Sequence, residues 1–142
     1  MKTKNHYQRY IAEYLKRRER YKQRHGHTSI TIQTKIDNWR QCLRRIERRE
    51  RLLAQYDAIV KSYMEVSVKN SANYRTGIYA KARCLFYKYC MENGVRASDI
   101  ARYCGCMDIR TPSVRRLKFT RSFATNSENK ELWHRFKQFI KQ

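Results

Sequence analysis

The chain has 142 residues, the length of one ordinary domain or of one small domain with an extension. Its 33 Lys and Arg against 12 Asp and Glu give a formal net charge of +21 at pH 7. This charge excludes an acidic DNA mimic and argues against a neutral housekeeping enzyme. It indicates a polyanionic partner, with nucleic acid favoured over an anionic membrane. The aromatic share of 13% argues against a disordered basic tail, and four glycines with one proline are too few for the turns of a barrel or sandwich, so an all-α protein is predicted.

A basic amphipathic helix is predicted over residues 5–24, where tyrosines and aliphatic residues recur at spacings of three and four. Gly26 is expected to end this helix, and the β-branched stretch 30–32 favours a short extended segment. We interpret the tyrosines as packing residues in preference to a base-stacking surface.

A second helix is predicted over residues 33–65, because its apolar residues keep the same spacing for most of that length. At roughly 1.5 Å per residue it would be about 45–50 Å long. Such a helix needs a partner for its apolar stripe. Either the first helix folds back on it as an antiparallel hairpin, or a second copy of the chain or another protein pairs with it in a coiled coil.

These two helices form a strongly basic arm, since residues 1–51 hold 16 Lys and Arg against 5 Asp and Glu. The densest run is RQCLRRIERRER, residues 40–51. Like charges at helical spacings repel each other, and a phosphate backbone relieves that repulsion and releases counterions, so we favour phosphate contact over a merely solvated face. The candidate phosphate contacts in this run are Arg44, Arg45, Arg48 and Arg49.

The stretch 66–76, VSVKNSANYRT, is polar and lacks helical periodicity, so it is predicted to be a linker. We place the domain boundary near residue 70, with a basic long-helix arm over 1–69 and a compact helical domain over 70–142. Within the second domain, helices are predicted over residues 77–93, 97–104, 111–123 and 128–141.

A helix-turn-helix is predicted over residues 97–123. The spacing Ala101-x-x-x-Gly105 places a small residue where the second helix crosses the first, and a glycine in the turn. The step Thr111-Pro112 is typical of a helix start, because threonine caps and proline suits the first helical turn. This arrangement is typical of DNA-reading domains.

The second helix of this motif is basic and free of acids, since none lies between Ile109 and Ser127. Val114 and Leu117 are predicted to pack it onto the core, whereas Phe119 is predicted to point elsewhere.

The run IYAKARCLFYKYCMENGVRASDIARYCGCMDIRTPSV, which begins at Ile78, resembles the C-terminal DNA-binding domain of the bacterial replication initiator family DnaA. Ile109 and Met107 stand where that family has His and Arg, and two extra residues follow Asp108, so the family's origin contacts are not carried over. The likeness covers roughly residues 74–125, and no Walker A loop occurs in the chain. It implies a helix-turn-helix fold and DNA contact, not replication initiation, in a small stand-alone protein of phage or mobile-element type. The matching positions are Ala82-Arg83, Ile100-Ala101, Cys104-Gly105 and Asp108.

Candidate DNA contacts follow from the position of the second helix, whose N-terminal part enters the major groove in a helix-turn-helix. For the arginines, a base-edge contact and a plain phosphate contact are equally open. The base-edge candidates are Arg110, Ser113, Arg115 and Arg116. The phosphate candidates are Arg75, Lys81, Thr111 and Lys118.

The five cysteines, without a secretory signal, indicate reduced thiols in the cytoplasm. Cys104-x-Cys106 with His25, His27 or His134 lacks the ligand spacing of a standard zinc finger, so neither a metal nor a cofactor is expected. No paired-acid, Cys–His or phosphate-loop pattern and no membrane-spanning run occur, so we predict a protein that is not an enzyme and has no membrane partner.

Three functions fit these patterns. The favoured one is a duplex DNA reader in transcription or replication control, which binds DNA in preference to RNA. The second is non-specific DNA or RNA packaging, in a virion or a ribonucleoprotein. The third is a protein-docking inhibitor of phage–host type. The expected location is the cytoplasm, at the nucleoid or in a phage-infected bacterial cell, with the virion as the alternative.

Overall fold

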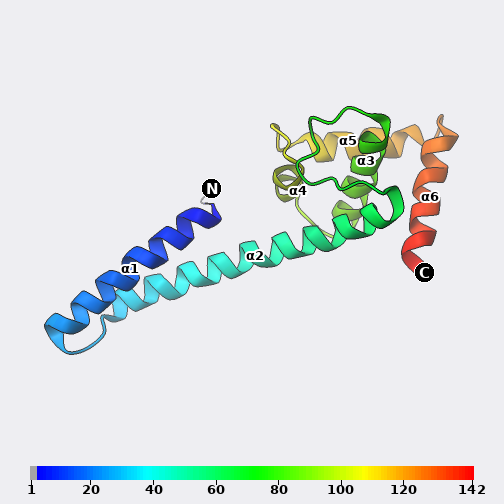
Figure 1. Ribbon diagram of the computed structural model, residues 1–142. Coiled ribbons are helices and arrows are strands. Elements are labelled where there is room, and N and C mark those ends of the chain that lie inside the picture. Colours follow the sequence, from blue (N-terminus) through cyan, green and yellow to red (C-terminus); the bar gives the residue numbers. More distant parts are fainter. Residues whose placement is uncertain (1–2) are drawn as a thin grey trace. The chain divides into compact units, whose positions relative to one another are not determined.

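The structure is a computed structural model that describes residues 3–142, and over these residues the chain forms six α-helices and no strand (Figure 1). The predicted all-α class is therefore confirmed. The helices are α1 (Lys4–His25), α2 (Ile30–Met64), α3 (Gly77–Glu92), α4 (Ala97–Cys104), α5 (Thr111–Ser122) and α6 (Ser127–Lys141).

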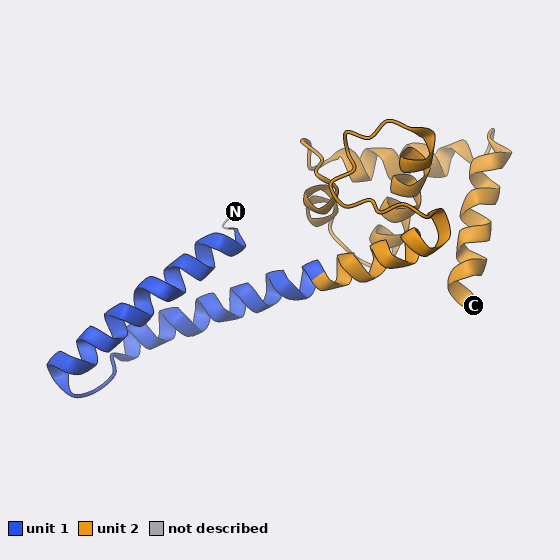
Figure 2. Ribbon diagram, in the orientation of Figure 1, with its two compact units in different colours: residues 1–50 blue, residues 51–142 orange. Residues whose placement is uncertain are grey.

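The chain forms two compact units, one ending at Glu50 and the other starting at Arg51 (Figure 2). The division falls inside α2, whereas the boundary near residue 70 predicted from the sequence lies within the second unit.

The first unit is an antiparallel helical hairpin, one of the two arrangements predicted for the arm. α1 ends at Gly26, whose φ of 76° lies in the left-handed region and whose N–H donates to the Lys22 carbonyl oxygen at 2.8 Å. α1 and the first half of α2 then run side by side (Figure 1). Across the hairpin, the Arg18 guanidinium donates to the Gln33 side-chain oxygen at 2.9 Å.

Aromatic packing holds this hairpin together. Ile36 is fully buried, and the Trp39 ring lies 5.3 Å from the Tyr10 ring and 4.7 Å from the Tyr14 ring, edge-on in the second case. For these two tyrosines, the interpretation as packing residues is confirmed.

The stretch 30–32 is the first turn of α2, so the predicted extended segment is wrong. Ser29 precedes this turn and caps it, because its hydroxyl accepts the Ile32 N–H at 3.4 Å and its carbonyl accepts the Gln33 N–H at 3.0 Å. A capped helix end satisfies backbone donors that an isolated extended segment would leave to water, and this outweighs the β preference of three residues.

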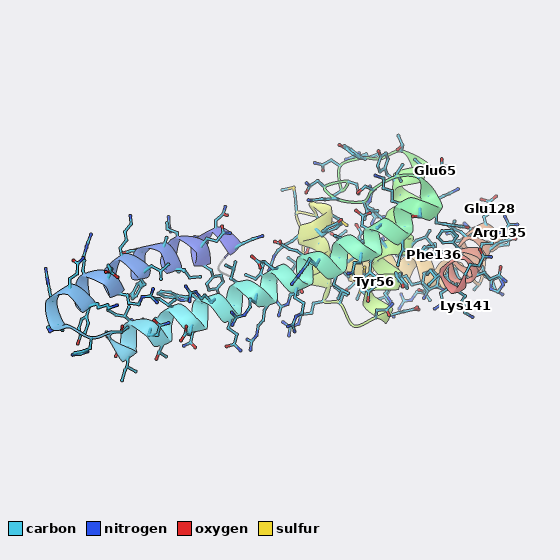
Figure 3. All side chains as sticks on the ribbon, turned by 60° about the horizontal axis from the view of Figure 1, so that its bottom comes forward. Tyr56, Glu65, Glu128, Arg135, Phe136 and Lys141 are labelled. Carbon is cyan, nitrogen blue, oxygen red and sulfur yellow. The ribbon has the colours of Figure 1, made fainter. Side chains whose placement is uncertain are left out.

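The second unit packs the end of α2, the segment 65–76 and α3 to α6 around one core. On α6, Phe136 is fully buried on the side turned toward α2, where its ring lies 5.5 Å from the Tyr63 ring, and Arg135 lies on the outer side (Figure 3). The other buried apolar residues are Leu53, Val60, Val68, Ala82, Leu85, Phe86, Tyr87, Cys90, Ile100, Ala101, Cys104 and Phe119.

The segment 66–76 belongs to this unit rather than linking two others. Val68 and Ser71 are fully buried. The Asn70 N–H donates to the Tyr103 carbonyl at 3.0 Å, and the Ala72 N–H to the Cys104 carbonyl at 2.9 Å. The segment thus satisfies the last carbonyls of α4, which a helix leaves without partners of its own.

Buried thiols make the second unit sensitive to alkali. Burial raises the pKa of Cys90, Cys104 and Cys84 above the ordinary thiol value of 9.0. The unfolded chain therefore loses these protons first as the pH rises, and the stability contributed by the neutral thiols is complete below about pH 9 and is lost above it.

We expect the free energy of unfolding, measured by urea titration of Trp133 fluorescence in a Trp39→Phe background, to be constant between about pH 7 and 8.5 and to fall at about pH 10. The Cys90→Ala variant should lose less stability over the same interval. A free energy that stays level up to about pH 10.5 would contradict the role of the thiols.

Candidate nucleic-acid interface

The turn between α4 and α5 is built by backbone hydrogen bonds around Gly105. Gly105 has a φ of 79°, and its N–H donates to the Arg102 carbonyl at 3.2 Å. The Cys106 N–H donates to the Ala101 carbonyl at 2.8 Å, which completes a Schellman motif. The predicted place of this glycine in the turn is confirmed. The connection 105–110 is longer than the three or four residues typical of a helix-turn-helix.

α5 begins at Thr111, and an acidic residue holds the arginine just before it. The Asp108 carboxylate accepts the Arg110 backbone N–H at 2.8 Å and two guanidinium nitrogens at 3.3 and 3.2 Å. These bonds hold the pKa of Asp108 below its usual range. Arg110 is thus exposed, but its charge is offset by the neighbouring carboxylate.

The face of α5 that packs on the core is not the predicted one. Pro112 and Phe119 are buried, whereas Val114 and Leu117 are exposed. The predicted core role of the last two is therefore wrong, as is the outward position predicted for Phe119. Phe119 buries more apolar area than valine or leucine, and its ring packs edge-on against the Phe123 ring at 5.0 Å. The rotation of α5 that buries Phe119 is therefore more stable than the one that would bury Val114 and Leu117.

The exposed face of α5 carries apolar and cationic side chains in register. Val114 and Leu117 are three residues apart. Lys118 follows Val114 by four residues and Arg121 follows Leu117 by four, so the four residues share one side of the helix. All four are exposed. We call this set the α5 surface: Val114, Leu117, Lys118 and Arg121.

The remaining candidates on α5 lie beside this surface. Arg115 is exposed and lies near the half-buried Cys84 of α3. Burial raises the pKa of that thiol, and the charge of Arg115 offsets part of this rise. Thr111, Ser113 and Arg116 are half-buried. Among residues 3–142, no carboxylate forms an ion pair with the cations at positions 115, 116, 118 and 121.

Two basic candidates lie at and near the start of α3 in the same unit. Arg75 precedes the helix, Lys81 lies in its first half, and both are exposed. Two other basic residues of α3 serve the fold instead. Arg83 donates to the buried Ser71 carbonyl at 2.6 Å, and Lys88 is buried against the Trp133 ring with an ion pair to a residue of its own helix. Side-chain burial therefore separates surface cations from structural ones, a distinction that the sequence pattern had not made.

In the first unit, four arginines of α2 form no ion pair with a carboxylate of the described chain. Arg44, Arg45 and Arg48 are exposed and Arg49 is half-buried, and none of them forms an ion pair within the described part of the chain. We call these four residues the arginine cluster.

The acids interleaved with the arginine cluster are engaged elsewhere. Glu50 and Glu47 lie 3.4 and 4.0 Å from the Lys4 ammonium group of α1. These two carboxylates thus pair across the hairpin, and the cluster keeps its charge.

The cysteines are all free thiols in the structure. Within residues 3–142, no group of His, Cys, Asp and Glu side chains is arranged to hold a metal ion, and no helix is both long enough and apolar enough to cross a membrane.

Protein-family models, curated proteins and solved structures yield no match to this chain. The likeness to the DnaA DNA-binding domain therefore stays a prediction. The geometry itself provides two basic surfaces. One is the α5 surface with Arg115 and Arg116 beside it, and the other is the arginine cluster. Among the described residues, the cations of both lack carboxylate partners.

Proposed function

We propose that the protein binds duplex DNA, with the α5 surface in the major groove and the arginine cluster on phosphates. The observation that carries this proposal is the exposed side of α5, which follows a glycine turn. Lys118 and Arg121 lie on it without carboxylate partners in the described part of the chain, and Arg115 and Arg116 lie beside it. An α-helix with its side chains is about 10–12 Å across and so fits a groove about 12 Å wide, and the 12 residues of α5 extend for about 18 Å.

The resemblance of the run beginning at Ile78 to the DnaA domain supports the same partner. Control of transcription or replication, in a bacterial or phage-infected cell, is the role that such a reader would serve. Unlike a catalyst, it would act by occupying its site.

The arginine cluster favours a second candidate function, the non-specific packaging of DNA or RNA. Its charge neutralises phosphates without reading bases, and such contacts supply most non-specific affinity. A pure packaging protein should bind all duplexes alike.

Selection from a random duplex pool, repeated at about 50 and 200 mM salt, distinguishes the two functions. The DNA reader should enrich a common sequence and keep it in the presence of excess random duplex, whereas packaging should enrich none. Both should lose affinity steeply with salt. Lack of binding to any duplex or RNA at low salt would refute both.

Replacing Asp108 with asparagine is expected to raise duplex affinity about threefold at low salt, because the change removes one negative charge at the start of α5 and releases the Arg110 guanidinium. The dependence on salt should become steeper by about one phosphate contact. Fluorescence anisotropy with a labelled duplex measures both quantities.

The matched control for Asp108→Asn is Glu131→Gln. It makes the same charge change and breaks a similar ion pair, that with Arg135 at 2.7 Å on α6. An equal gain of affinity in both variants would show a general charge effect, and would count against a place for Arg110 in the interface.

A further inference from the structure

The α5 surface has an apolar centre that a phosphate-binding surface does not need. Val114 and Leu117 are 47% and 50% exposed, and Ile109 and Met107 in the preceding turn are exposed as well. Four large apolar side chains thus reach solvent within a short stretch of the second unit. Grouped exposed apolar residues mark binding sites, because water contact with them is unfavourable.

The cations around this centre narrow the choice of partner. Val114 is followed one helical turn later by Lys118, and Leu117 by Arg121, so each apolar side chain has a positive charge beside it on the same side of α5. A complementary partner presents apolar groups next to negative charges.

The major groove of DNA has this arrangement. Phosphates line its two edges, and on its floor the 5-methyl group of thymine is the apolar group that the base pairs present. A helix whose centre is polar reads the hydrogen-bonding atoms of bases, whereas valine and leucine contact this methyl group.

We infer that Val114 and Leu117 are specificity-determining residues that contact thymine 5-methyl groups in the major groove, between phosphates bound by Lys118 and Arg121. The inference rests on the proposed function, and it adds the base that is preferred and the side chains that prefer it. Arg115 and Arg116, by contrast, lie beside these residues and not on the same side of the helix.

Deoxyuridine provides a direct probe, because it differs from thymidine only by the absence of the 5-methyl group. We compare binding of the full-length protein to an A·T-rich duplex of about 30 base pairs, made with thymidine or with deoxyuridine throughout. Burial of one methyl group corresponds to about a fourfold change in affinity, so two contacts predict about a fifteenfold preference for the thymidine duplex.

The Val114→Ser/Leu117→Ser variant should bind the thymidine and deoxyuridine duplexes with equal affinity, and so lose the preference for thymidine, while the salt dependence of binding stays the same. Both positions are exposed, so the variant is expected to fold, and circular dichroism with Trp133 fluorescence checks this. Ile30→Ser, which removes an exposed apolar residue from the first unit, is the matched control and should keep the preference.

The possible results separate the inference from the proposed function. Equal binding of the two duplexes by the unchanged protein would overturn the inference and leave duplex binding intact. A preference that persists in the double variant would overturn it too, because the methyl effect would then arise from duplex shape. Loss of all binding in the double variant would point to a general docking role of this apolar centre, for DNA or for an acidic protein, and would also overturn it. If the unchanged protein binds neither duplex, the proposed function itself fails.

Discussion

Replacing the arginine cluster, Arg44, Arg45, Arg48 and Arg49, with alanine is expected to weaken binding to every duplex on the order of 100-fold at about 0.1 M salt. None of the four guanidinium groups has a carboxylate partner in the described chain, so all of their charge is available to phosphates. Sequence preference should not change, because phosphate contacts position a protein without reading bases.

The dependence of this affinity on salt tests the mechanism. Each neutralised phosphate adds about 0.9 to the slope of log affinity against log salt concentration, so the slope should become shallower by roughly three to four in the alanine variant. The variant with four lysines should keep nearly the whole slope. A large loss in the lysine variant would indicate hydrogen bonding specific to guanidinium groups, contrary to a purely electrostatic role.

A control for net charge removes four cations from α6 instead. The alanine variant of these residues makes the same change in formal charge and leaves the α5 surface and the arginine cluster in place, so its affinity should fall much less. If the two variants lost affinity equally, binding would depend on the total charge of the protein and not on the arginine cluster. The four α6 residues are Lys130, Arg135, Lys137 and Lys141.

Local signals were enough to predict the helices and several of their ends. Gly26 and Gly105 end helices in the left-handed conformation, and the Thr111-Pro112 step begins one, because each of these effects depends on the residue and its immediate neighbours. Only the capping serine before residue 30 was overlooked, and it turned an expected extended segment into helix.

The orientation of α5 was not predictable from spacing alone. Val114 and Leu117 fit a helical stripe as well as Pro112 and Phe119 do, since each pair lies on one side of the helix. What decides between them is the area buried against helices distant in sequence. The exposed apolar centre of the candidate site was missed for this reason, whereas its cations were found because charge needs no tertiary context.

The segment 66–76 illustrates the same limit. Its polar composition is typical of a linker, but its backbone partners are the carbonyls of Tyr103 and Cys104, more than 30 residues further along the chain. Hydrogen bonds to such distant groups leave no periodic pattern in the sequence.

The largest stability loss is expected from Asp57→Ala, which removes the centre of a buried hydrogen-bond network in the second unit. Asp57 is 5% exposed, and its carboxylate accepts three bonds: from the Ser67 hydroxyl at 2.6 Å, the Val68 N–H at 3.0 Å and the Tyr103 hydroxyl at 2.6 Å. The network joins the end of α2 to the segment after it and to α4. Alanine would leave the buried Val68 N–H and two half-buried hydroxyls, those of Ser67 and Tyr103, without this acceptor, which costs about 3 kcal/mol.

This cost corresponds to a fall in melting temperature of about 15 °C for a unit of this size. Thermal and urea unfolding, followed by Trp133 fluorescence in a Trp39→Phe background, measure it. Asp57→Asn keeps an acceptor oxygen and should lose about half as much. A loss below about 1 kcal/mol in the alanine variant would show that water replaces the carboxylate at low cost.

A double-mutant cycle isolates the bond of this network that reaches α4. Burial and the bond to Asp57 raise the pKa of Tyr103, so the neutral hydroxyl is the donor at all ordinary pH values. Tyr103→Phe removes that donor, and the double variant with Asp57→Ala should therefore be more stable than the sum of the single losses predicts, by about 1 kcal/mol or more. Additive losses would show that the two side chains stabilise the unit independently. Duplex affinity of the Asp57→Ala variant, measured well below its melting temperature, should stay within about threefold, because the proposed DNA contacts lie on α5 and in the arginine cluster and not in this network.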